Sequence, residues 1–299
     1  MAKSVLVVGD VISDDYIYVK TVRDASEAPI PVWDEVKRES RPGGAWNVAR
    51  NIQTMGSELD VYLAGILSPS RWSRREGEED RATFCFGGDP LTKTRYVSGA
   101  DRIIFRHDDR LKFDPVESEL LLENINGKVG TRRFDAVVFS DYDKGTLTAD
   151  MIHFCKSLSD LIVIDSKRRD LEVFSRHQVG KTSILKLNEF EYSTQVTVHR
   201  DDQYPVEALF DYLVVTKGKE GATLRQFDRV ESKINRFAIH SEEFPTKKVW
   251  ALDVTGCGDT HTAAMTVSLL RDGDIRKAVR FGNEQAAKAV VQFGTVAVW

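Results

Sequence analysis

Four short apolar stretches, each followed directly by polar or charged residues, constrain the fold of this 299-residue chain more than any other feature. They cover residues 136–139, 161–164, 183–185 and 212–215. Unbroken apolar runs of this length are typical of strands that are buried on both faces. Segments with a helical pattern, such as 151–158, lie between several of them. The alternation predicts an α/β fold whose central sheet is mostly parallel and carries helices on both faces.

Two further apolar runs, 5–8 and 61–66, predict additional strands of the same sheet. The first run leads into Asp10, and Asp14 follows shortly after it. In open α/β sheets, ligands bind at the carboxyl ends of the strands. Asp10 and Asp14 are therefore candidates for holding sugar hydroxyls, although each also suits a solvated turn; for Asp15 we favour the turn.

Residues 253–260 (DVTGCGDT) predict a loop that opens a helix, because helically spaced apolar residues follow over 262–270. Gly256 and Gly258 let the backbone approach a ligand closely. The free N–H groups of a helix N-terminus favour an anion. Asp259 would repel that anion unless it takes a proton from an attacking hydroxyl, which indicates phosphoryl transfer to an alcohol. An ordinary glycine turn with a capping Asp explains the stretch equally well when it is taken alone.

A second glycine pair, Gly43 and Gly44, leads into a predicted helix that Gly56 ends. Asn47 lies one turn into this helix. Exposed backbone beside an amide side chain can hydrogen-bond a polyol, but a plain junction between a loop and a helix has the same pattern. The pair is weak evidence by itself.

Two irregular stretches, about 12–41 and 83–107, interrupt the strand and helix pattern. The first contains Pro29 and Pro31, and we expect short strands and turns in it. The two stretches are predicted to pair as a small sheet that covers the end of the main sheet as a lid. The mixed-charge run 69–81 is expected to be a solvated loop or a short helix.

Composition narrows the class of protein. A net charge of −4 gives no support for binding to nucleic acid or to an anionic membrane surface. No apolar run reaches the roughly 18 residues that span a bilayer. The three cysteines are isolated and are expected to be reduced thiols of a cytoplasmic protein. The six histidines are scattered, which argues against zinc, and we interpret His261 as structural.

The motifs at 43–49 (GGAWNVA) and 253–259 (DVTGCGD) resemble the two signatures of the ribokinase-like (PfkB) family of carbohydrate kinases. The resemblance covers nearly the whole chain. It implies a three-layer ribokinase-like fold in a single domain, with a β-sheet lid that is often also a dimer interface in this family. It also implies phosphoryl transfer from ATP to a sugar hydroxyl in the presence of Mg²⁺.

The resemblance also implies roles for individual residues. Asp259 is implied as the base, beside an anion hole of Gly256, Cys257 and Gly258. Asp10, Asp14, Gly43, Gly44 and Asn47 are implied to hold the sugar. The nucleotide and its phosphates are expected near Lys167, Asn188, Glu191, Thr216, Gly218 and Asn283. Glu191 is expected to act on Mg²⁺ indirectly, through a water molecule.

One branch of the family resembles this chain further: the kinase half of the bacterial enzymes that combine heptose-7-phosphate kinase and heptose-1-phosphate adenylyltransferase activities. The segments 5–16 (VLVVGDVISDDY), 26–32 (SEAPIPV), 41–45 (RPGGA), 140–145 (SDYDKG) and 293–295 (FGT) carry this resemblance, and 26–32 is the most telling of them. It implies D-glycero-D-manno-heptose 7-phosphate as acceptor and its 1,7-bisphosphate as product, on the path to ADP-heptose for the lipopolysaccharide core. We expect no nucleotidyltransferase domain in this chain.

Several positions depart from the family pattern. Trp46 replaces a small Ala, Ser166 a Pro and Cys257 an Ala, and the charged run follows residue 66. Trp46 is expected to reshape the sugar pocket, and we interpret Cys257 as a small spacer. Two alternatives therefore remain open: a kinase of the same fold that acts on another phosphorylated sugar or a nucleoside, and a non-catalytic protein that binds sugar or nucleotide.

Overall fold

The computed structural model describes residues 2–67, 83–86, 88–99, 101–109, 112–175, 181–198, 209–227 and 238–298. The charged run 69–81 lies outside these residues. The described part contains a nine-stranded sheet in the order β13-β12-β11-β10-β9-β8-β1-β4-β5. Its strands are β1 (Ser4–Gly9), β4 (Asp60–Ile66), β5 (Thr83–Phe86), β8 (Ala136–Asp141), β9 (Leu161–Ser166), β10 (Thr182–Asn188), β11 (Tyr212–Thr216), β12 (Ala222–Phe227) and β13 (Ala238–Phe244).

The sheet is parallel from β5 to β11, and β12 and β13 add an antiparallel edge. The expected parallel strands are confirmed, and the four apolar stretches that predicted them are neighbours in chain order. β1 pairs with β4 on one side and with β8 on the other. The strand order therefore reverses between β1 and β8, which is where sheets of this class bind ligands.

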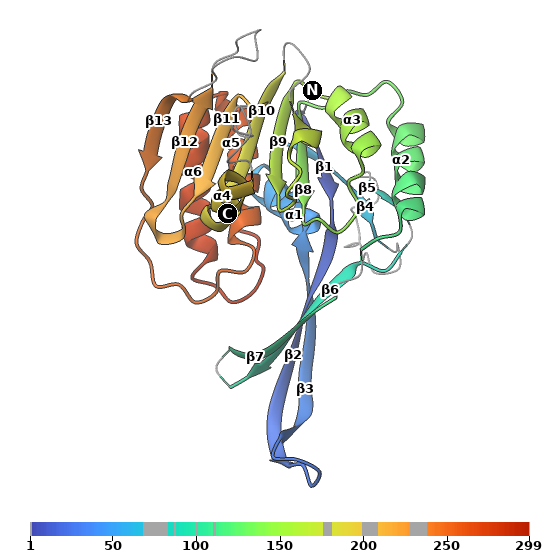
Figure 1. Ribbon diagram of the computed structural model, residues 1–299, viewed down its shortest axis with the longest axis vertical. Coiled ribbons are helices and arrows are strands. Elements are labelled where there is room, and N and C mark those ends of the chain that lie inside the picture. The colour runs from blue at the N-terminus through green and yellow to red at the C-terminus, as the bar shows by residue number, and fades with distance from the viewer. Residues whose placement is uncertain are drawn as a thin grey trace.

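Successive residues of the central strand pack into two separate cores. Val5 and Val7 belong to one core, and Leu6 and Val8 belong to the other. Side chains of a strand alternate between its two faces, so each core lies on one face of the sheet. The helices α1, α5 and α6 cover the first face and α2, α3 and α4 the second (Figure 1). Their bounds are α1 (Ala45–Met55), α2 (Pro115–Val129), α3 (Ala149–Ser157), α4 (Glu189–Val198), α5 (Cys257–Asp272) and α6 (Ile275–Ala289).

A second sheet of four strands projects from the body as a long arm (Figure 1). Its order is β3-β2-β6-β7, with β2 (Val11–Asp24), β3 (Pro31–Gly44), β6 (Leu91–Ser98) and β7 (Arg102–Asp108). We call it the lid sheet. β2 follows β1 after a single residue, and β3 leads directly into α1. The arm is therefore rooted at the carboxyl edge of the main sheet.

Three details of the sequence-based expectation need correction. The lid strands β2 and β3 each have 14 residues, so they are not short. The second lid segment begins at Leu91 rather than at Thr83, because β5 pairs with β4 of the main sheet. α5 begins at Cys257 rather than near residue 262, so residues 253–256 form the predicted loop and Asp259 already belongs to the first helical turn.

Candidate active site

Asp10 follows β1 directly, at the point where the strand order reverses. Its carboxylate accepts hydrogen bonds from the backbone N–H groups of Tyr142 (2.7 Å), Lys144 (3.2 Å) and Thr146 (3.3 Å). Asp10 is fully buried. Burial, together with the nearby charge of Asp141, raises its pKa to about 6. In this structure the carboxylate holds the loop after β8 in place, so a role in sugar binding would add to this structural one.

Asp14, the second predicted sugar ligand, is buried in an ion pair with Arg95 of the lid, with 2.5 Å between Oδ1 and Nη1. Gly43 lies directly against it, and a Cβ atom at Gly43 would lie 2.2 Å from Asp14 Oδ2. Gly44 has a φ of +57°, and a Cβ atom there would lie 2.3 Å from the Asp10 carbonyl oxygen. The glycine pair thus lets the end of the lid pass close to both aspartates.

The first turn of α5 begins after Gly256, which is left-handed with a φ of +76°. Side chains other than glycine rarely adopt this conformation. Of the predicted anion-hole groups, the Cys257 N–H already donates to the Val254 carbonyl at 3.3 Å. Burial raises the pKa of the Cys257 thiol to about 12, which agrees with its interpretation as a neutral spacer. The amides of Gly256 and Gly258 are the better placed candidates for an anion.

Asp259 lies in this first turn and is buried. Its Oδ1 accepts the hydroxyl of Tyr142 at 2.6 Å, and its Oδ2 accepts Asn47 Nδ2 at 3.0 Å. Burial raises the pKa of Asp259, while the hydrogen bonds from Asn47 and Tyr142 oppose the increase. Asn47, predicted to bind the sugar, therefore holds the predicted base in this structure. A carboxylate fixed at a helix N-terminus has the arrangement that a general base for an attacking hydroxyl needs.

Tyr142 is a site residue to which the sequence analysis gave no role. It follows β8 at the strand reversal, and burial raises its pKa well above 10, so it remains a hydrogen-bond donor. Lys93 Nζ lies 4.5 Å and Lys167 Nζ 3.9 Å from the centroid of its ring. The motif 140–145 had singled out this tyrosine as a mark of a branch, but a motif by itself does not show which side chain meets the base.

A buried ion pair between β9 and β10 contacts the first turns of α5. Lys186 Nζ of β10 lies 2.8 Å from Asp165 Oδ2 of β9, and Thr262 of α5 donates to the same oxygen at 2.8 Å. Although burial alone would lower the pKa of Lys186, the Asp165 carboxylate raises it. Lys186 lies between Leu185 and Leu187 in β10. The sequence pattern did not show whether its side chain is buried in an ion pair or exposed to solvent.

A pocket of about 360 Å³ lies beside the N-terminus of α5, where Cys257, Gly258 and His261 line it. Three of the predicted nucleotide residues line it: Thr216, Gly218 and Asn283. Apolar side chains complete the wall, among them Val249, Val254, Ala287 and Val290. A mostly apolar cleft with a few polar groups is typical of a site for a small molecule.

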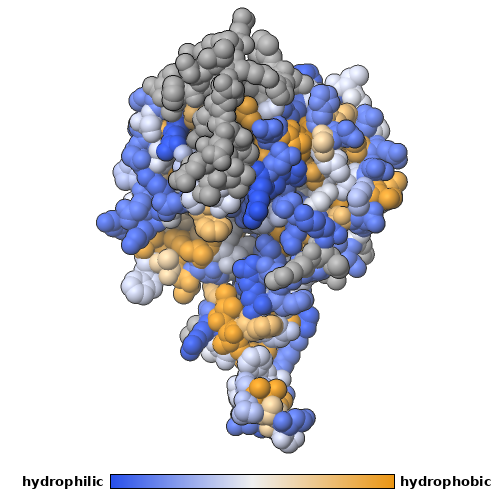
Figure 2. Space-filling view, viewed as in Figure 1, coloured by the Kyte–Doolittle hydropathy of each residue, from blue (hydrophilic) through white to orange (hydrophobic). Residues whose placement is uncertain are grey.

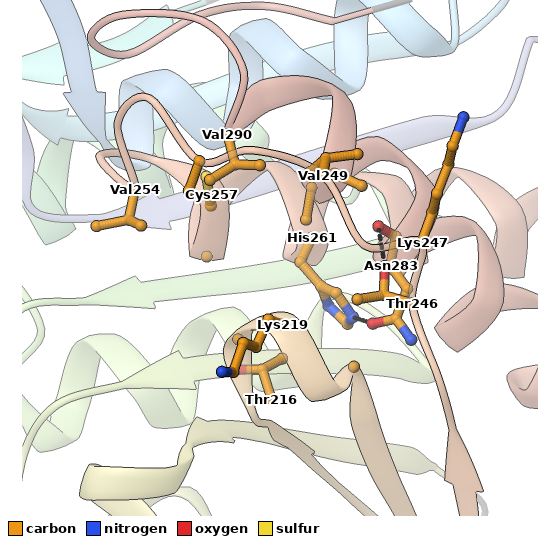
Figure 3. A pocket seen from close by; sticks show the side chains of 16 residues that line it. Thr216, Lys219, Thr246, Lys247, Val249, Val254, Cys257, His261, Asn283 and Val290 are labelled. Atoms are coloured by element: carbon orange, nitrogen blue, oxygen red, sulfur yellow. Dashed lines mark hydrogen bonds between the residues drawn. The ribbon is translucent and has the colours of Figure 1, made fainter.

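His261 and Asn283 point toward each other in this pocket, with 3.2 Å between His261 Nε2 and Asn283 Oδ1 (Figure 3). Asn283 also donates from Nδ2 to the Phe244 carbonyl at 2.8 Å. Burial lowers the pKa of His261 to about 3, so the ring is neutral at pH 7. His261 faces Asn283 rather than Asp259, as its structural interpretation requires, and it also lines the pocket.

The remaining predicted phosphate and metal residues cap α4. Asn188 Oδ1 accepts the Glu191 N–H, and Glu191 Oε2 accepts the Asn188 N–H, both at 2.8 Å. Glu191 Oε1 lies 3.9 Å from Lys167 Nζ. The reciprocal bonds form the box that stabilises helix N-termini. Glu191 Oε1 takes no part in this box and lies near Lys167, and it can still accept a hydrogen bond from a water molecule.

Trp46 is partly buried and packs against the core that α1, α5 and α6 share. Over the described ranges, no three histidine, cysteine or acidic side chains gather as metal ligands would. None of the helices within those ranges combines the length and the apolar character that crossing a membrane requires.

Comparison with known proteins adds three findings. Residues 89–299 match the family model described as pfkB family carbohydrate kinase. The bifunctional protein HldE of Salmonella paratyphi B is 33% identical over 307 residues. That match covers 98% of this chain but only 61% of the relative, so the chain spans less than two thirds of it.

Solved structures share the fold at lower identity. Phosphofructokinase-2 from Escherichia coli matches with a TM-score of 0.70 at 15% identity, covering 99% of this chain and 95% of that one. Ribokinase from Thermotoga maritima matches with a TM-score of 0.68 at 17% identity, covering 99% and 95% respectively.

Proposed function

The chain belongs to the pfkB family of carbohydrate kinases and is an ATP-dependent sugar kinase, and we propose that its acceptor is D-glycero-D-manno-heptose 7-phosphate. The γ-phosphate of ATP would go to the anomeric hydroxyl, giving the 1,7-bisphosphate. The resemblance of segments 26–32 and 140–145 to heptose-7-phosphate kinases supports this acceptor. The product would serve ADP-heptose synthesis for the lipopolysaccharide core, in the cytoplasm.

The buried Asp259 carboxylate, held by Tyr142 and Asn47 at the N-terminus of α5, is the observation that carries the proposal. In the proposed reaction, the acceptor hydroxyl oxygen attacks the γ-phosphorus and its proton passes to Asp259. The bond to the β-phosphate oxygen breaks, and ADP leaves. The N-terminal amides and dipole of α5 would stabilise the negative charge on the transferred group.

The pocket beside α5 would hold ATP, with the base against Val249, Val254 and Val290 and the polar groups of Thr216, Gly218 and Asn283 along the nucleotide. Lys167 and Asn188 lie toward the phosphates in this proposal. Mg²⁺ is usually bound by substrate phosphates with one or two carboxylates and several waters. Glu191 Oε1 fits the indirect role, because only Glu191 Oε2 is engaged in the helix cap.

Asp10, Asp14, Gly43, Gly44 and Asn47 are proposed to border the acceptor. They lie around the root of the lid sheet, and they are not among the residues that line the nucleotide pocket. Asp10 and Asn47 would keep their present hydrogen bonds and use remaining lone pairs for the sugar, since each carboxylate or amide oxygen accepts two bonds.

We also propose a homodimer through the lid sheet. The exposed apolar side chains of this sheet and of the turn between β2 and β3 include Val22, Ile30, Val36, Ile103, Ile104 and Phe105. Figure 2 shows hydrophobic side chains on this projecting arm. Sedimentation should give the mass of two chains for the wild type and of one chain for Val36→Glu, since a carboxylate would be buried at the contact. A wild type that sediments as one chain at assay concentrations would end this proposal.

The function is tested by ADP release with ATP and Mg²⁺ across heptose 7-phosphate, hexose phosphates, ribose and nucleosides. We expect turnover mainly with heptose 7-phosphate. Asp259→Asn should keep ATP binding, measured by calorimetry, and lose about 10²- to 10⁴-fold in kcat, the usual contribution of a general base. A preference for another acceptor would contradict the proposed substrate but not the proposed role of Asp259 as the base. Binding of ATP and sugar without ADP release would indicate a binding protein instead.

A further inference from the structure

Two lysines from different parts of the molecule meet at one aromatic ring. Lys93 extends from the lid strand β6, and Lys167 follows β9 of the body. Both ammonium groups lie within 4.5 Å of the centroid of the Tyr142 ring, at 4.5 Å and 3.9 Å. The hydroxyl of that ring bonds Asp259. Two positive charges are therefore held beside the predicted base.

The carboxylates that pair with the basic side chains around Lys93 do not form an ion pair with Lys93 itself. Nearby basic side chains each have one: Arg95 has Asp14, Arg106 has Asp108, Lys186 has Asp165 and Lys167 has Glu191. Within the part of the chain that the structure describes, no ion pair within 4.0 Å forms at Lys93 Nζ. Burial lowers the pKa of Lys93, although Asp14 opposes this effect. An anion bound here would offset both the loss of hydration and the repulsion from Lys167.

The register of the lid places Lys93 on the acceptor side. Lys93 is the direct cross-strand partner of Asp14 in the pairing of β2 with β6. It does not line the pocket assigned to ATP, which is formed by residues of β11, α5 and α6 and the segments beside them. A phosphosugar kinase must bind the triphosphate of ATP and, separately, the phosphate of the sugar. Lys93 of the lid and Lys167 of the body are two cations that could serve these two places.

We propose that Lys93 binds the phosphate group that the sugar acceptor already carries, while Lys167 remains on the side of the ATP phosphates. This inference rests on the proposed phosphosugar acceptor. Lys93 then selects phosphorylated sugars over free sugars. The lid supplies this cation, so an acceptor phosphate would also hold the lid strand β6 against the body.

The test compares Lys93→Met and Lys93→Arg with the wild type on one sugar with and without its phosphate. Heptose 7-phosphate and free heptose are the first pair, and the best phosphosugar of the panel replaces them if it is a different one. A hydrogen bond between charged groups contributes about 10- to 100-fold in affinity. We expect Lys93→Met to raise KM for the phosphosugar by that factor, to lower kcat/KM for the phosphosugar much more than kcat/KM for the free sugar, and to leave KM for ATP unchanged. Lys93→Arg should retain most of the affinity.

Lys128→Met, an exposed lysine of α2, is the matched control and should change no parameter. Thermal unfolding of each variant checks that the fold is intact. A rise in KM for ATP would assign Lys93 to the γ-phosphate and overturn the proposal, as would an equal loss on both sugars. A wild type that turns over free sugars as well as phosphosugars would also overturn it, while leaving the kinase assignment in place.

Discussion

The hydroxyl of Tyr142 donates a 2.6 Å hydrogen bond to Oδ1 of Asp259, which links the loop after β8 to the first turn of α5. The same tyrosine donates its backbone N–H to Asp10 at the end of β1. One residue thus connects the strand reversal of the sheet to the predicted base. The orientation of the Asp259 carboxylate depends on the position of this loop.

Tyr142→Phe should reduce kcat by about tenfold, because a hydrogen bond to a charged group is worth about 1.5–3 kcal/mol and Asn47 still holds the other oxygen. The Tyr142 hydrogen bond lowers the pKa of Asp259, so its removal raises that pKa. The base works only when it is ionised. The acid limb of the profile of kcat against pH should therefore move to higher pH. If kcat falls but the acid limb of the pH profile does not move, Tyr142 only holds the geometry of the site and does not affect the pKa of Asp259.

Gly256→Ala should lose activity as well as stability. The left-handed φ of +76° is unfavourable for alanine, and its Cβ atom would lie 2.8 Å from Asn47 Nδ2. Relief of this contact would move Asn47 away from Asp259. We expect a loss of about 1–2 kcal/mol in the free energy of unfolding and a fall in kcat at unchanged KM for ATP. Gly273→Ala is the control, because its φ is also positive, at +68°, but nothing lies within 4 Å of the added atom.

The sequence predicted the sheet because its signal is local. Apolar strands such as 136–139 and 161–164 can be predicted from their composition alone. In a parallel sheet, the polar residues that follow such strands lie at one edge. The glycine stretch before Asp259 likewise predicted a helix N-terminus from residues that are contiguous in the chain. These features depend on short-range backbone preferences.

The partners of the site residues could not be predicted in this way, because they come from distant segments. Asn47 meets Asp259 across 212 residues of chain, and Lys186 meets Asp165 across 21. The lid gave a misleading signal for a related reason. A projecting two-sided sheet lacks the strict alternation of a half-buried strand, so β2 and β3 read as short irregular pieces although they pair along their length.

Lys186→Met should strongly destabilise the protein. Lys186 and Asp165 are both nearly inaccessible to solvent. Removing the cation leaves the Asp165 carboxylate buried, with Thr262 as the one remaining hydrogen-bond donor to its Oδ2 atom among the described residues. Breaking a buried pair in this way costs about 3–5 kcal/mol in the free energy of unfolding. Urea denaturation measures the loss. The double variant Asp165→Asn, Lys186→Met should recover part of it, since the unpaired charge is gone; a double variant less stable than the single one would contradict this account.

His261 should make stability depend on pH in the mildly acidic range. Its pKa is about 3 in the folded protein, against an ordinary value of 6.5, because burial disfavours the charged ring. Between these two values the unfolded chain binds a proton that the folded chain does not. The contribution of His261 to the free energy of unfolding must then fall as pH decreases below about 6.5, by roughly 1.4 kcal/mol per pH unit. His261→Gln removes this contribution. Urea denaturation of both proteins without nucleotide, from pH 8 to pH 4.5, should give a stability difference that is constant above pH 7 and shifts in favour of the variant below pH 6.5. A difference that stays constant over the whole range would mean that the folded protein protonates His261 as readily as the unfolded chain does.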